Sequence, residues 1–251
     1  MVDDRRKKLL EFKNVTISIN DEVLYNDLNL VISEGDRFIF LGPNGVGKSL
    51  LLKLISLGYS RNLQSEYKGL IVKGQILDSF GNDLLNPNVA RKHISYSEQI
   101  DTPYNNTTIL EEAETACAGS EIDLDEAKLD RLLDTFNLTN KKKKRIKGNV
   151  SGGEGKLIQL ITRILKLKKA DILLLDEPLN HLSFENSRKF NDVIIEEIKT
   201  KPELAIIMVS HCRAANFTDK ALVYDRESKN LKIVEYSAYD CFSDNFCSTI
   251  C

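Results

Sequence analysis

A glycine-rich segment that ends in lysine and serine has the residue types needed to hold phosphate groups. It reads Gly42-Pro43-Asn44-Gly45-Val46-Gly47-Lys48-Ser49 and fits the pattern G-x-x-x-x-G-K-[ST]. The glycines would let successive backbone N–H groups turn toward phosphate oxygens, while Lys48 neutralises the outer phosphates and the Ser49 hydroxyl ligates Mg²⁺. An ordinary glycine-rich turn is the alternative, but a predicted strand before the segment and a predicted helix after it favour a phosphate-binding loop.

Two adjacent carboxylates follow a strongly apolar stretch further along the chain. The run from Ile172 to Leu175 predicts a buried strand, and Asp176 and Glu177 come directly after it. Adjacent side chains of an extended chain point different ways, so Asp176 can face a metal while Glu177 faces an attacking water. Acidic residues often end strands, and the pair alone is weak evidence. Together with the phosphate-binding loop it indicates a site for phosphoryl transfer.

The hydrophobic patterns around these motifs predict strands that alternate with helices. Strands are expected at 10–19, 27–32, 37–41, 171–175 and 204–210, with hairpin strands within 221–234, and helices at 49–57, 151–167 and 184–199. This order is typical of an α/β fold. Residues 101–150 differ, since acidic residues on expected helices precede the basic run 141–145. We interpret 101–150 as an inserted helical lobe and the basic run as a solvated helix cap.

Length and composition fit one large domain and exclude several classes of function. The 251 residues, 42% of them hydrophobic, suffice for one core with or without an inserted lobe. Because 35 Lys and Arg nearly balance 37 Asp and Glu, no direct nucleic-acid binding is expected from the overall charge. The charged N-terminus lacks a secretory signal pattern, and the apolar runs are shorter than the ~20 residues of a membrane-spanning helix. We therefore expect a cytoplasmic location.

The cysteines suggest neither a disulfide framework nor a metal centre. There are five of them, an odd number, in a chain much larger than the small secreted domains that depend on disulfides. Cys241, Cys247 and Cys251 cluster near the C-terminus, yet their spacing lacks the C-x₂₋₄-C pairs typical of zinc sites. Reduced thiols are the expected state.

A third motif connects the phosphate-binding loop and the carboxylates to a known family. Val150-Ser151-Gly152-Gly153-Glu154 lies upstream of Asp176 and resembles the signature motif of ABC ATPases. Other family landmarks fall in the same order along the chain. Gln99 resembles the Q-loop glutamine, Asn180-His181-Leu182-Ser183 occupies the D-loop, and His211 resembles the switch histidine. The resemblance covers essentially all of 1–251. It implies a single ABC ATPase domain, a P-loop NTPase core with an antiparallel β subdomain, and 101–150 as the helical lobe that leads to the signature.

The resemblance also implies roles for particular residues. Two ATPase domains would pair head to tail and hold each ATP between the phosphate-binding loop of one, from Gly42 to Leu50, and Ser151, Gly152 and Gly153 of the other. A serine hydroxyl and glycine amides at a helix N-terminus would form an anion site that another chain's nucleotide completes. The metal would be Mg²⁺, held by Ser49, Gln99 and Asp176. Glu177 would act as general base and His211 would contact the γ-phosphate.

Four positions depart from the family pattern. Ile19 stands where an aromatic ring usually stacks on adenine, with Tyr25 nearby as a less well aligned substitute, and Leu50 replaces a second hydroxyl after Ser49. Ser183 and Glu154 replace the usual D-loop aspartate and signature glutamine. These changes bear on base recognition, on dimer tightness and on the hydrolysis rate.

The leading hypothesis for function is the ATP-binding and ATP-hydrolysing subunit of an ABC transporter. It would drive a separate transmembrane permease from the cytoplasmic face of the membrane, as a homodimer or paired with a sister ATPase. An ABC ATPase that acts on the ribosome or another assembly is the first alternative, which the triplet Asn180-His181-Leu182 weakly suggests. A non-catalytic nucleotide-dependent switch is the second.

Overall fold

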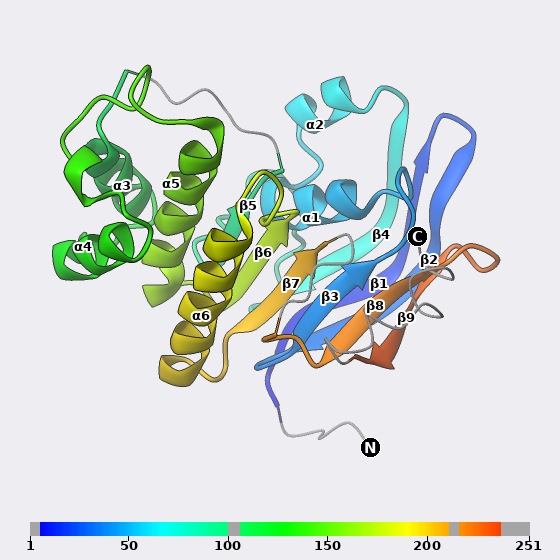
Figure 1. Cartoon of the computed structure of the whole chain (residues 1–251). Helices are drawn as coiled ribbons and strands as arrows, with labels where there is room; N and C mark the ends of the chain where they lie inside the picture. Colours follow the sequence, from blue (N-terminus) through cyan, green and yellow to red (C-terminus); the bar gives the residue numbers. More distant parts are fainter. Residues whose placement is uncertain (1–5, 100–105, 211–215, 237–251) are drawn as a thin grey trace.

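Two β-sheets with helices packed around them make up the molecule, as seen in the computed structural model (Figure 1). The structure describes residues 6–99, 106–210 and 216–236. The smaller sheet is antiparallel, with strand order β2-β1-β4, and the larger one has the order β5-β6-β7-β3-β8-β9. This arrangement confirms the predicted α/β fold with an antiparallel β subdomain.

The antiparallel sheet is built from β1 (Lys8–Ile19), β2 (Glu22–Ser33) and β4 (Leu70–Asp78). β1 and β2 form a hairpin in which Ile19 pairs with Glu22, and β4 pairs with the other edge of β1, where Ile19 lies opposite Leu70. The backbone N–H of Asn20 at the hairpin turn donates to the Gly69 carbonyl at 3.0 Å. The tip of the hairpin and the start of β4 are therefore fixed together.

The larger sheet is parallel from β5 to β8 and ends in an antiparallel hairpin. Its strands are β5 (Ile94–Ser97), β6 (Ile172–Asp176), β7 (Ala205–Val209), β3 (Arg37–Leu41), β8 (Lys220–Asp225) and β9 (Asn230–Glu235). Every residue of β6 and β7 is buried, as expected for central parallel strands covered on both faces. Parallel strands end at one common edge, which is where ligands bind in such sheets. The phosphate-binding loop after β3, Gln99 beyond β5 and Glu177 after β6 share this edge.

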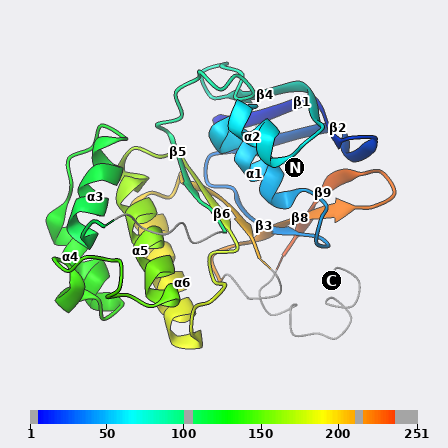
Figure 2. The same ribbon diagram turned by 90° about the horizontal axis from the view of Figure 1, so that it is seen from above.

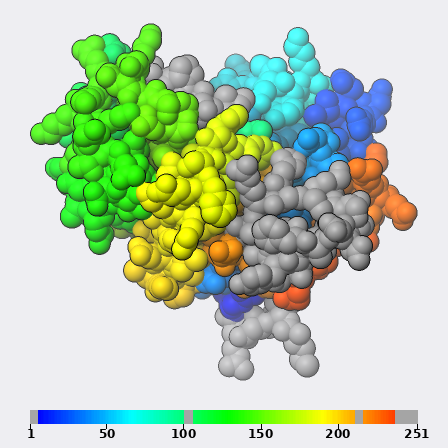
Figure 3. All heavy atoms as spheres, viewed as in Figure 1, coloured from blue at the N-terminus to red at the C-terminus, as the bar shows by residue number. Residues whose placement is uncertain are grey.

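The helices fall into three groups. α1 (Lys48–Leu57) lies between the two sheets, the short α2 (Arg61–Glu66) lies above it, and α6 (Phe184–Thr200) covers the opposite face of the larger sheet (Figure 1). α3 (Ile109–Ala118) and α4 (Glu126–Thr135) form the helical lobe, and α5 (Gly152–Leu165) follows it, with short 3₁₀ turns η1 (Thr139–Lys141) and η2 (Lys166–Lys168). The view from above places α3 and α4 on the far side of α5 from the sheet (Figure 2). In surface view the lobe is a separate bulge beside α6 (Figure 3).

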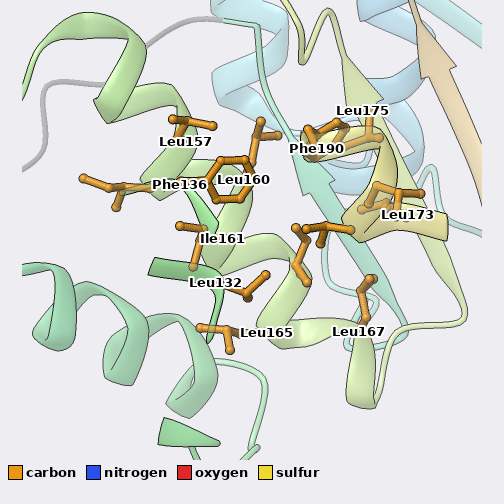
Figure 4. Close-up of a cluster of buried hydrophobic side chains, with 14 of the residues drawn as sticks. Leu132, Phe136, Leu157, Leu160, Ile161, Leu165, Leu167, Leu173, Leu175 and Phe190 are labelled. Atoms are coloured by element: carbon orange, nitrogen blue, oxygen red, sulfur yellow. The ribbon is translucent and has the colours of Figure 1, made fainter. Parts of the chain in front are cut away.

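α5 joins the helical lobe to the sheet through one hydrophobic core. Leu132 of α4 and Phe136, which follows that helix, face Leu160 and Ile161 of α5, and the same cluster continues to Phe190 of α6 (Figure 4). The labelled side chains of this cluster are Leu132, Phe136, Leu157, Leu160, Ile161, Leu165, Leu167, Leu173, Leu175 and Phe190. The middle and end of α5 are consequently packed from both sides. None of the helices in the described ranges is long and apolar enough to cross a membrane.

Candidate nucleotide-binding site

The phosphate-binding loop joins the end of β3 at Leu41 to the start of α1 at Lys48. Gly45 and Gly47 have φ angles of 84° and 87°, a left-handed conformation that favours glycine. A Cβ on Gly47 would also lie 3.1 Å from Cδ1 of Leu24, so this position is crowded as well. No side chain caps α1 at Gly47. Its first N–H groups therefore suit an anion held in the loop.

The Lys48 side chain is hydrogen-bonded to the backbone of its own loop. Its Nζ donates to the carbonyl oxygens of Gly42 and Pro43 at 2.7 and 2.8 Å, and only 6% of the residue is exposed. These two residues thus face the lysine through their carbonyls, while Asn44, Gly45 and Gly47 line the open side of the loop. The ammonium group is preset at the place where phosphate oxygens would enter.

Ser49 and Asp176 meet across the gap between α1 and β6. The Ser49 hydroxyl donates to Oδ1 of Asp176 at 3.0 Å. Asp176 is 1% exposed, and burial raises the pKa of its carboxyl group while the Ser49 hydrogen bond partly offsets that shift. In the described part of the chain its Oδ2 has no hydrogen-bond partner. A buried carboxylate with an unpartnered oxygen beside a hydroxyl is a fitting oxygen donor set for Mg²⁺.

Glu177 is held by two side-chain amides and by its backbone. Gln99 Nε2 donates to Oε2 of Glu177 at 2.8 Å, and Asn180 Nδ2 donates to the same oxygen. The Glu177 N–H donates to the Val209 carbonyl at 3.0 Å, and φ at Glu177 is 46°, a conformation unfavourable for a residue with a side chain. The carboxylate is thus positioned by its neighbours. Sequence reasoning placed Asn180 in the D-loop without giving it this contact.

One cavity of about 440 Å³ connects these groups. Its lining residues are Ile19, Leu24, Asn44, Gly45, Gly47, Lys48, Ser49, Leu50, Tyr67, Gln99 and Glu177. The structure thereby brings together residues far apart in the sequence at the edge of the sheet. Four of the residues predicted for the phosphate-binding loop and the metal do not line the cavity: Gly42, Pro43, Val46 and Asp176, the last of which is connected to it through Ser49. His211 lies outside the described residues.

The signature segment begins α5 away from this cavity. Ser151 caps the helix: its hydroxyl accepts from the Glu154 N–H at 3.3 Å, and Glu154 Oε2 accepts from the Ser151 N–H at 2.8 Å. Lys141 Nζ, 2.7 Å from Glu154, lowers the pKa of that carboxyl group. Lys141 is therefore not the solvated helix cap that the basic run suggested. Ser151 and Gly152 are exposed, and a Cβ on Gly153 would lie only 3.0 Å from the His181 carbonyl.

Comparison with known families identifies this architecture. The sequence profile of the family described as "ABC transporter" matches residues 25–180, which is more than half of the chain. The chain belongs to the ABC transporter family. Its fold agrees with the ABC structure "Structure of ATP binding subunit of ABC transporter", at a TM-score of 0.72 and 18% identity over 92% of each chain. A nucleotide-free ATP-binding cassette from an ABC transporter gives a TM-score of 0.68 at 17% identity, covering 94% of this chain and 96% of that one.

The curated ABC relatives are of two kinds. "Probable iron export ATP-binding protein FetA" of Escherichia coli (strain K12) is 26% identical, over 91% of this chain and 96% of its own length. "ABC transporter F family member 2" of Arabidopsis thaliana is 28% identical over 82% of this chain. This chain spans only 26% of the length of that protein and 30% of "ATP-binding protein Uup" of Buchnera aphidicola.

Tyr25 does not line the cavity, contrary to its expected role. Ile19 and Leu24 line the cavity, whereas Tyr25 is fully buried beneath the phosphate-binding loop. Its ring packs edge to face against Tyr224, with centroids 5.6 Å apart. The interpretation of Tyr25 as a substitute platform for adenine is therefore wrong. The aromatic side chain that does reach the cavity is Tyr67, which the sequence analysis did not identify.

Proposed function

We propose that this chain binds and hydrolyses ATP and thereby drives a separate membrane permease. The observation that supports this most strongly is that Lys48, Ser49 and Glu177 line one cavity, with Asp176 hydrogen-bonded to Ser49 behind it. Membership of the ABC family supports ATP as the nucleotide. We propose in addition the chemical roles of the site residues and the coupling of hydrolysis to a permease.

In this proposal the triphosphate enters the loop and takes the Lys48 ammonium group from the carbonyls of Gly42 and Pro43. Ser49 and Asp176 would hold Mg²⁺, which offsets negative charge on the phosphates. Glu177 takes a proton from the attacking water as its general base. Because Gln99 and Asn180 already fix the Glu177 carboxylate, its orientation costs little further ordering when the water binds.

A second copy of the chain, or a sister ATPase, completes the site. Ser151, Gly152 and Gly153 do not line the cavity of their own chain, and Ser151 and Gly152 are exposed at the start of α5. Helix N-terminal amides suit the γ-phosphate of ATP held by another chain. His211 is assigned the contact to the γ-phosphate from its position in the sequence.

Transport is favoured over action on the ribosome by the name of one relative. The iron export ATP-binding protein of Escherichia coli is 26% identical over 91% of this chain. We accordingly propose a peripheral subunit on the cytoplasmic face of the membrane. The alternative, an ABC ATPase that acts on another assembly, is supported weakly by the triplet Asn180-His181-Leu182.

The decisive experiment follows an epitope-tagged chain and its Lys48→Ala variant in their native cells. Membrane flotation and ribosome sedimentation are run on the same lysate, with ATPase activity measured on the purified chain. We expect the chain to float with membranes and the variant to lose ATP turnover. Migration with ribosomes instead of membranes would favour the alternative that the chain acts on the ribosome. Unchanged ATP turnover in the Lys48→Ala variant would refute the assignment of the site.

A further inference from the structure

Tyr67 is a cavity residue that no family motif accounts for. It follows α2 directly, is partly buried, and lines the same cavity as Lys48, Ser49 and Glu177. It is the one aromatic residue among those that line this cavity in the described chain. Leu50, which also lines the cavity, has no side-chain hydrogen-bond donor. The phenol of Tyr67 adds a side-chain hydroxyl to the lining beside that of Ser49.

Several contacts fix the Tyr67 ring over the helix that carries Ser49. Lys53, one turn after Ser49 on α1, places its Nζ 5.7 Å from the centre of the ring. The same Nζ pairs with Glu66 of α2 at 2.5 Å. The backbone N–H of Tyr67 donates to the Leu63 carbonyl at 2.9 Å and ends α2. The position of the ring thus depends on the contact of Lys53 of α1 with Glu66 of α2.

The hydroxyl of Tyr67 is a proton donor close to carboxylates. Burial raises the pKa of Tyr67 to about 12, and the charge of Glu66, its hydrogen bond with the phenol and the smaller effects of Asp176 and Glu98 act in the same direction. The phenol therefore keeps its proton at neutral pH. A neutral donor close to carboxylates is well suited to a phosphate oxygen, because a hydrogen bond to a charged acceptor is stronger than one to a neutral acceptor.

We propose that Tyr67 is a nucleotide-binding residue whose hydroxyl donates to the γ-phosphate end of ATP. The inference rests on the proposed function, since it takes ATP as the occupant of the cavity. It also links α2 to the bound nucleotide, because the ring can hold the phosphate only while Lys53 and Glu66 keep α2 against α1. The ring engages Lys53 rather than serving as a free platform for the base.

The test uses Tyr67→Phe, which keeps the ring and its contact with Lys53 but removes the hydroxyl. Affinity for Mg²⁺ with a non-hydrolysable ATP analogue, and for Mg²⁺ with ADP, is measured by calorimetry. We expect about tenfold weaker binding of the ATP analogue, the scale for losing one hydrogen bond to a charged acceptor, and less than a twofold change for ADP. Tyr59→Phe is the matched control, since its hydroxyl donates to the Leu70 carbonyl at 2.6 Å outside the cavity. This control should leave both affinities unchanged.

The possible results distinguish a failure of the Tyr67 assignment from a failure of the proposed ATP-binding function. Unchanged affinity for the ATP analogue in Tyr67→Phe, or equal weakening for ATP analogue and ADP, would overturn the role of Tyr67 at the γ-phosphate. Weakening by Tyr59→Phe as well would assign the effect to a disturbed α2, and would also overturn it. A Lys48→Ala variant that still binds the ATP analogue normally would refute the proposed function, whatever Tyr67 does.

Discussion

Replacing Glu177 with glutamine tests the assignment of the general base. The side chain follows β6, where Gln99 Nε2 and Asn180 Nδ2 both donate to Oε2. Glutamine has the same shape and keeps one oxygen that can accept these hydrogen bonds, but its amide cannot take a proton from water. The variant should therefore retain the geometry of the site and lose the chemistry.

The expected loss is large in rate and small in binding. Removing a general base typically lowers the rate by about 10² to 10⁴, which corresponds to about 3 to 5 kcal/mol in the activation free energy. Binding should be unchanged or tighter, since the substitution removes a negative charge from a cavity that receives the negative triphosphate. ATP would then accumulate in the paired state, because each site also needs Ser151 of the opposite chain.

Phosphate release and size-exclusion chromatography with and without ATP measure both effects. The matched control is Glu185→Gln: Glu185 lies in the first turn of α6, where it pairs with Lys189 at 2.8 Å, and does not line the cavity. Hydrolysis at the parental rate in Glu177→Gln would refute the general-base assignment. A variant that binds ATP but stays monomeric would instead indicate that a sister ATPase is required.

Three further predictions concern the base, the metal and the core. Because Ile19 supplies no aromatic stacking, worth ~1 to 3 kcal/mol, ATP and GTP should compete almost equally; a preference for ATP of a hundredfold or more would contradict this. Asp176→Asn should remove the gain in nucleotide affinity on adding Mg²⁺, measured by titration with and without the metal, and a persisting gain would exclude Asp176 as a ligand. Leu160→Ala should lower the free energy of unfolding by about 2 to 5 kcal/mol in denaturant melts, whereas Leu57→Ala, 43% exposed, should change it far less; equal effects would contradict the shared core.

The elements that carry the phosphate-binding loop and the carboxylates were predictable from sequence because they are buried on all sides. β3, β6 and β7 are short apolar runs bounded by turn residues or carboxylates, and their bounds differ from the expectation by a residue at most. The spacing of leucines likewise predicted α1 from its glycine-rich start. A strand that is buried on both faces is a continuous apolar run, which can be recognised in a single sequence.

Three elements, β4, β5 and α2, were not predicted. The middle of β4, from Lys73 to Gln75, is exposed, and Gly74 interrupts the strand with φ 87°, where a Cβ would lie 2.4 Å from the Asn14 carbonyl oxygen. β5 has only four residues, two of them serines, and is recognisable only once β6 lies beside it. α2 is a single short turn capped by Ser60, too brief to show a periodicity.

The two errors of site reading have the same physical origin. Position in a hairpin does not say which side chain faces a cavity, and Tyr25 turns inward beneath the loop while Leu24 lines the cavity. Tyr67 reaches the cavity only because Lys53 and Glu66 hold α2 against α1. Both facts depend on contacts between distant segments, which no local pattern encodes.

The closed conformation of the phosphate-binding loop has a consequence for ligand selection. With two loop carbonyls bound to Lys48, the protein already carries an internal competitor for its own ammonium group. Any anion must replace these hydrogen bonds before it gains from the charge of Lys48. A single small anion offers too few contacts to offset that exchange, whereas a polyphosphate chelated with a metal makes several at once. We therefore expect inorganic phosphate to bind the loop far more weakly than a metal-chelated nucleoside triphosphate.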